Sequence, residues 1–171
     1  MKNTKQERQC NFAQKLAGYT PIPWQQIPDL GLYMDQVITF VERQCEVLYM
    51  EGERIFTPAM VNNYVKIGLV QRPDGKKYGR WQLAQLLMIC VLKQAASAED
   101  LKRIVLPVKG DEQEALYTLF CSVQTQEFAS LTAELPQLSP MTCAVRGATY
   151  RFLCNALLAK NPAAALEEEQ P

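Results

Sequence analysis

Apolar residues recur at helical spacing along most of the chain, and this pattern predicts a mainly α-helical protein. One helix is predicted from about Leu32 to Met50. A second is predicted from about Trp81 to Ala95, where apolar residues lie on nearly every side, as is typical of a helix in the core. Residues 111–135 predict an uninterrupted helix, and a final helix is predicted from Ser139 to about Lys160. The main apolar stripe of the first helix consists of Met34, Val37, Ile38, Val41, Cys45 and Leu48.

A shorter helix is marked by its start and stop signals. Thr57 is a suitable N-cap, and Pro58 fits the first helical position, where the missing N–H of proline costs nothing. Gly68 is suited to the left-handed conformation that ends helices. The helix between them therefore has about two and a half turns.

A turn signal follows this short helix. Pro73-Asp74-Gly75 lies at the centre of residues 70–78; proline fixes one φ and glycine accepts a positive one. The segment predicts a tight two-stranded ribbon. Together with the short helix, this ribbon predicts a winged helix-turn-helix core with a small two-stranded wing.

The chain divides into four predicted parts. Residues 1–31 hold a short helix at 5–17 and a Pro-rich extended segment, and residues 32–109 form the winged-helix core. Residues 110–160 are a C-terminal helical pair that completes the core, mediates dimerisation or encloses an effector pocket, and periodicity does not separate these roles. Residues 161–171 form a flexible tail that frays.

Charge is distributed unevenly, although the whole chain has no net formal charge. From Arg54 to Lys109 there are ten Lys and Arg against three acids, a net charge of +7, while residues 1–53 carry −2 and residues 110–171 carry −5. A basic patch on one domain is typical of proteins that bind nucleic acid.

The predicted short helix carries side chains suited to DNA. Asn can pair bidentately with adenine in the major groove, and Lys neutralises a phosphate. We therefore expect the helix to read bases and the wing to contact the flanking backbone. For Tyr78 two roles stay open, packing at the base of the wing or donating its hydroxyl to a phosphate. The predicted DNA-binding residues are Asn62, Asn63, Lys66, Arg72, Lys76, Lys77, Tyr78 and Arg80.

The composition offers little catalytic machinery. The chain has no histidine, the commonest general base, and no Gly-x-Ser-x-Gly, phosphate-binding glycine loop or Cys-x-x-Cys motif. Its six cysteines are scattered and are expected to be reduced and mostly buried. We expect no enzymatic activity, no cofactor and no metal site.

Neither membrane insertion nor export is predicted. No apolar run approaches the ~20 residues of a membrane span, and no signal-like stretch follows the first five residues. The protein is predicted to be cytoplasmic.

Two resemblances extend this interpretation. Thr57-Pro58-Ala59, Lys66-Ile67-Gly68-Leu69 and Lys76-Lys77-Tyr78 resemble the helix start, helix end and wing of the mercury-resistance-type (MerR) regulators, although Asn62 and Asn63 stand where that family usually has an arginine and an aromatic residue. A closer resemblance spans about residues 22–106. The runs IPDLGLYMDQVITFVE, FTPAMVNNYVKIGLV and KKYGRWQLAQLLMICVLKQAAS are similar to the bacterial proteins grouped as domain-of-unknown-function family 1836, or ykrK-type. This resemblance implies a small helical, MerR-like protein and a transcription regulator.

Two functions follow as hypotheses. The first is a homodimeric transcription regulator that binds double-stranded DNA through a MerR-like winged helix-turn-helix. The alternative is a protein-protein interaction module that keeps the winged-helix scaffold without binding DNA.

Overall fold

The protein is built from helices, which confirms the mainly α prediction. The computed structural model describes residues 15, 18–49, 53–105 and 108–160. The predicted helix at 5–17 lies almost wholly outside these residues, and the tail at 161–171 lies outside them as well. The α-helices are α2 (Met34–Cys45), α3 (Pro58–Lys66), α4 (Arg80–Leu92), α5 (Ala98–Val105), α6 (Asp111–Glu134) and α7 (Pro140–Lys160). Three short 3-10 helices are η1 (Trp24–Gln26), η2 (Glu46–Leu48) and η3 (Leu135–Gln137).

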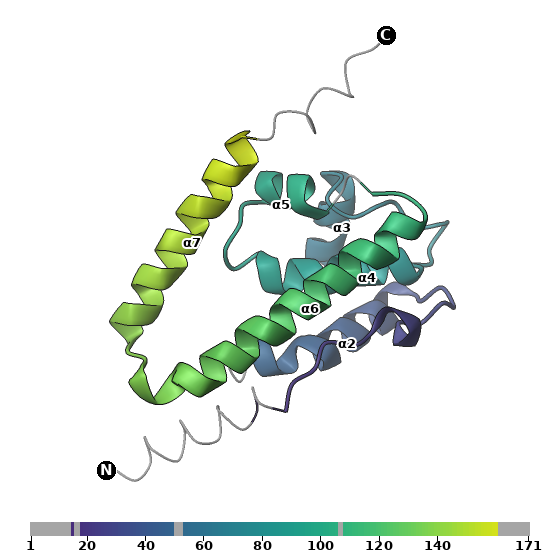
Figure 1. Ribbon diagram of the computed structural model, residues 1–171. Helices are drawn as coiled ribbons and strands as arrows, with labels where there is room; N and C mark the ends of the chain where they lie inside the picture. Colours follow the sequence, from purple (N-terminus) through teal and green to yellow (C-terminus); the bar gives the residue numbers. More distant parts are fainter. Residues whose placement is uncertain (1–14, 16–17, 50–52, 106–107, 161–171) are drawn as a thin grey trace.

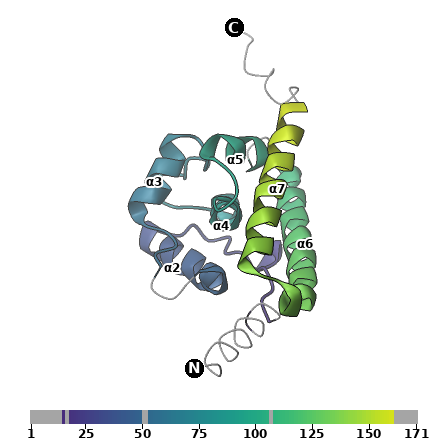
Figure 2. The same ribbon diagram turned by 90° about the vertical axis from the view of Figure 1, so that its left-hand side faces the viewer.

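Helix α4 is the centre of the molecule. Figure 2 shows it nearly end-on, with α2, α3, α5 and α6 around it. Leu83, Leu86 and Ile89 of α4 are completely buried. An apolar residue on almost every side of α4 is what the sequence predicted, and a helix of that kind is stable only when neighbours cover it all round.

Two helices begin where a short side chain accepts a hydrogen bond from a backbone N–H of the first turn. The Thr57 hydroxyl accepts the N–H of Met60 at 3.2 Å at the start of α3. Before α5, the Ser97 hydroxyl accepts the N–H of Asp100 at 3.2 Å and donates to its carboxylate at 2.6 Å. At the end of α3, Gly68 has φ +74°, which agrees with the predicted stop.

The predicted two-stranded wing is wrong. The described part of the chain contains no β-strand, and residues 70–78 form an irregular loop. Its turn is present, because Gly75 has φ +59° and the Lys77 N–H donates to the Asp74 carbonyl at 3.1 Å. The pairing does not extend beyond this turn.

The backbone groups that a wing would pair across the turn are used elsewhere. The N–H of Val70 donates to the Tyr64 carbonyl at 3.1 Å. On the other arm, Tyr78 exchanges two hydrogen bonds of 2.9 Å with Leu32, which precedes α2. Each residue has one N–H to give, so the two arms have few groups left for each other. The winged helix-turn-helix class is therefore not the fold of this chain.

The Pro-rich segment lies across the helical core through Trp24. Its ring lies 6.5 Å from that of Trp81 in α4 and 6.1 Å from that of Tyr117 in α6, measured between centroids. The Tyr117 hydroxyl donates to the Ile22 carbonyl at 2.9 Å. These contacts join the segment before α2 to both α4 and α6.

The last two helices meet at a corner formed by η3. Figure 1 shows α6 crossing the molecule and α7 leaving this corner to lie along the outside, beside α5. An ion pair of 2.5 Å between Arg146 and Glu134 spans the corner.

Candidate nucleic-acid interface

Helix α3 has one buried and one exposed face. Val61 is fully buried on the inner face, and the Tyr64 ring meets Phe56 edge-on at 5.9 Å between centroids. Asn62 and Lys66 are four residues apart, so they lie above one another on the outer face, and Asn63 lies beside them. All three side chains are exposed. The structure therefore brings the three predicted helix residues together on one open surface.

The loop after α3 adds exposed basic side chains to this surface. Arg72, Lys76 and Lys77 are all exposed. The Lys77 ammonium lies 5.4 Å from the centre of the Tyr33 ring. This cation–π contact favours one position of the long Lys77 side chain. Residues 57–80 contain five bases and one acid. The local surface is therefore basic even without a wing.

An open groove of about 630 Å³ separates α3 from the start of α2 and the loop. Asn62, Lys76 and Tyr78, three of the predicted site residues, line it. Asp35 also lines it, so the groove carries charges of both signs. Its remaining lining is mostly apolar and consists of Tyr33, Met34, Pro58, Val65, Pro73 and Gly75.

Two predicted site residues are partly withdrawn from this surface. The Arg80 Nε donates to the Ile27 carbonyl at 3.1 Å, and its guanidinium lies 3.6 Å from the Asp29 carboxylate and 5.7 Å from the centre of the Trp24 ring. Arg80 thus fastens the Pro-rich segment to the start of α4. The Tyr78 side chain is only 4% exposed, which favours the packing role.

One lysine of the basic patch, Lys93, points into the protein. Lys93, just after α4, donates to the Ile55 carbonyl at 2.7 Å. Its ammonium lies 4.5 Å from the centre of the Phe56 ring and 5.3 Å from that of Tyr49. Burial lowers the pKa of Lys93. The charge that the protein can offer to a partner is therefore smaller than the sequence count implied.

A small polar cluster lies beside Lys93. The Tyr49 hydroxyl donates to the Cys90 carbonyl at 2.7 Å and lies 3.6 Å from the Cys90 sulfur. A hydrogen bond to Cys90, together with burial, raises the pKa of the Cys45 thiol. Both cysteines are free and buried. A thiol held protonated in this way is a poor nucleophile, which fits a packing role.

Gln85 is a buried polar residue that the sequence analysis did not single out. Its side chain is fully buried in α4, and its Oε1 accepts the N–H of Gln71 at 3.0 Å. Gln82, one turn earlier, donates to the Arg72 carbonyl at 3.3 Å. These two amides hold the first arm of the loop against α4. A glutamine within an otherwise apolar helical run was the available signal.

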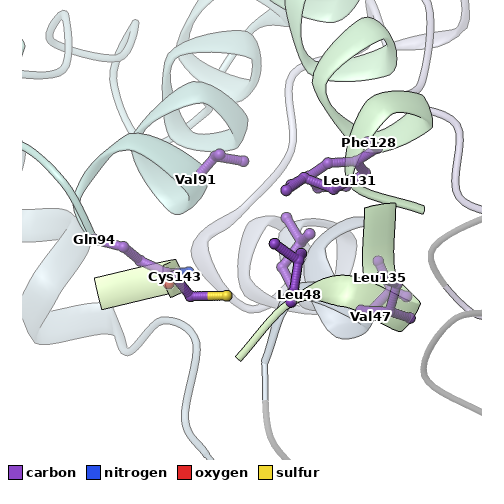
Figure 3. A pocket seen from close by; sticks show the side chains of 9 residues that line it. Val47, Leu48, Val91, Gln94, Phe128, Leu131, Leu135 and Cys143 are labelled. Carbon is purple, nitrogen blue, oxygen red and sulfur yellow. The ribbon is translucent and has the colours of Figure 1, made fainter. Parts of the chain in front are cut away.

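A second, apolar pocket of about 310 Å³ lies where the end of α4 meets the corner between α6 and α7. Figure 3 shows Val91, Leu48 and Leu131 around it, with the Cys143 thiol at one side. Gln94 supplies an amide. This is the region for which the sequence left an effector pocket open.

The described residues contain no group of three Cys, Asp or Glu side chains able to hold a metal ion. Their helices include none with the length and apolar character that a membrane crossing requires.

The length of its match to one family model shows which protein family this chain belongs to. A family model described as a domain of unknown function (DUF1836) matches residues 22–120, more than half of the 171 residues. The chain belongs to the DUF1836 family. This confirms the family predicted from the sequence. Comparison with curated proteins and with solved structures found no match. The resemblance to mercury-resistance-type regulators gains no support from these comparisons.

The DUF1836 match contains the whole candidate interface. It runs from the Pro-rich segment through α5 and into the first part of α6. Helix α7 lies beyond it. In this DUF1836 protein, the candidate interface on α3 therefore lies within the family match, whereas α7 lies outside it.

Proposed function

We propose that the protein is a transcription regulator that binds double-stranded DNA as a homodimer. The observation that supports this most is the exposed face of α3, where Asn62, Asn63 and Lys66 lie together beside a basic loop. In the proposed complex, α3 lies in the major groove. Arg72, Lys76 and Lys77 contact phosphates on the flanking backbone.

The dimensions of α3 suit this role. Its nine residues make a rod about 13 Å long, and the major groove is about 12 Å wide, enough to admit a helix. Lys66 lies near the C-terminal end of α3, so it reaches a phosphate while Asn62 and Asn63 face base edges. The cap at Thr57 fixes the start of the helix, which sets the register of these side chains.

The deciding experiment is selection of bound sequences from random duplex DNA with the full-length chain. Enrichment of one sequence family is the expected result, and a palindrome would additionally report two-fold symmetry of the bound protein. Binding should weaken steeply as salt increases, because phosphate contacts release counterions. Absence of enrichment, together with binding that does not respond to salt, contradicts the proposal.

One observation favours a second candidate function, the binding of a protein segment. The groove beside α3 is lined mostly by apolar residues, and Asp35 within it repels a phosphate. In this case the same surface takes a peptide with an apolar side chain and a basic neighbour. Val65→Glu would block such a peptide, whereas Lys76→Ala would leave it bound.

A further inference from the structure

Helix α7 presents large apolar side chains to solvent over most of its length. No described side chain from Pro140 to Ala159 is buried. Phe152 is 70% exposed and Leu157 is 68% exposed. A helix with this much apolar surface is normally covered. Its other large exposed apolar side chains are Met141, Val145, Tyr150 and Leu153.

The exposed side chains cover the part of α7 that points away from the molecule. At 100° per residue, they spread over about half of the helix circumference. The opposite side faces α5, where the Arg103 guanidinium donates to the Leu158 carbonyl and the Cys154 side chain is half-buried. The exposed side of α7 is therefore left uncovered by the described part of the chain.

Helix α6 offers an exposed apolar surface of its own. Leu119 is 60% exposed and Val123 is 49% exposed. They are four residues apart, and Glu127 continues the same row. This row lies on the side of α6 that does not contact α4.

The charges of the two helices are complementary. Helix α6 contains five acids and no base, whereas α7 contains three bases and no acid. Arg146 and Glu134 already form an ion pair within the chain. Glu127 remains exposed in the middle of α6. A partner that carries both an acidic and a basic helix of matching length is a second copy of this chain.

The exposed area is enough for a stable dimer. Eight large apolar side chains on α6 and α7 are each about half to three-quarters exposed. If each lost about 100 Å² to the partner, one copy would bury about 800 Å², the usual value for a specific protein–protein interface.

We infer that two copies associate through α6 and α7, with α7 of each copy lying against α6 of the other. The interface has two-fold symmetry, so the same contact forms twice. This inference supplies the dimer surface of the proposed regulator and rests on that proposal only for its biological role. Its tests contain no DNA, so it can fail while DNA binding holds, and the reverse.

The first test is the molar mass of the full chain in solution by sedimentation equilibrium at micromolar concentration. The expected mass is twice 19.4 kDa. Phe152→Glu and Leu119→Glu should each raise the dimer dissociation constant at least about 100-fold, because each buries two charges at the symmetric contact. Leu30→Glu is the matched control, since Leu30, at 83%, is the most exposed large apolar residue in the described part of the chain and lies outside α6 and α7. Circular dichroism checks that all three variants stay helical. A monomeric wild type, or a dimer that neither α6 nor α7 variant weakens, overturns the inference.

The second test identifies which helices meet. Glu127→Lys should weaken the dimer about tenfold, because it replaces an acid by a base in the row of α6 that faces the basic α7 of the partner. If α7 instead met α7, Glu127→Lys would have no effect, which contradicts the proposed arrangement.

Discussion

At the scale of single residues, the exposed lysine side chains and the exposed asparagine side chains of the interface should have different effects on DNA binding. Replacing Lys76 and Lys77 together with Ala should weaken binding to every sequence and reduce the salt slope by about two units. Asn62→Ala should instead relax the sequence preference by ~1 to 3 kcal/mol at one position. Arg43→Ala is the control, because Arg43 is an exposed basic residue within α2, nine residues after Met34, which lines the groove. Fluorescence anisotropy with selected and scrambled duplexes measures both effects. A loss of equal size for Arg43→Ala would show that overall charge, not this surface, causes the binding.

The same scale shows what sequence could predict about individual residues. Helix caps were predictable, because Thr57 acts only on backbone a few residues away. The positions of Lys93 and Arg80 were not, because their partners Ile55 and Ile27 lie far along the chain. A count of Lys and Arg in the sequence treats every one as surface charge, even where the fold turns the side chain inward. The exposure of the α3 side chains therefore agrees with their predicted position, while their contact with DNA stays a prediction. The positions of long side chains with distant partners could not be predicted.

At the scale of elements, helices were predictable and the wing was not. A helix satisfies its own backbone, so periodicity within one segment largely predicts it, as for α4 and α6. A ribbon depends on which backbone groups are free. Here the N–H of Gln71 is taken by Gln85, and Tyr78 pairs with Leu32, both through contacts between distant segments. The turn signal at Gly75 was correct, but a turn does not determine what its two arms pair with.

The junction between α3 and the loop gives a prediction at this scale. Gly68 has φ +74°, so Gly68→Ala should lower the free energy of unfolding by about 1 to 2 kcal/mol, although nothing lies within 4 Å of the added Cβ. Gly147 is the matched control. It lies inside α7, its added Cβ also meets nothing within 4 Å, and its φ is not positive. Gly147→Ala should therefore raise the free energy of unfolding by about 0.5 to 1 kcal/mol. Urea unfolding measures both, and changes of equal sign would contradict the strain assigned to Gly68.

At the scale of the whole molecule, ionisable groups are divided between surface and core in an unusual way. There is no histidine to titrate near neutral pH. The shifted groups are mainly tyrosines and cysteines around α4 and α6. Burial raises the pKa of Tyr19, Tyr49 and Tyr117 above the ordinary value of 10.0. The pH response of folding should therefore appear on the alkaline side.

The sign of that response follows from the state that binds more protons. A phenol with a raised pKa stays protonated in the folded chain, so its contribution to stability is complete below pH 10 and is lost as the pH rises above it. Each such phenol lowers the free energy of unfolding by up to about 1.4 kcal/mol per pH unit. Lys93 acts in the opposite direction, because burial lowers its pKa, but it is one group against five tyrosines whose pKa burial raises. Urea unfolding under reducing conditions should give constant stability from pH 6 to 8 and a steep fall above pH 10.

Tyr117→Phe should make the fall less steep, and phenolate absorbance at 295 nm should rise together with unfolding for the buried tyrosines. If all seven tyrosines ionised near pH 10 while the helices remained intact, the burial of these rings would not survive in solution.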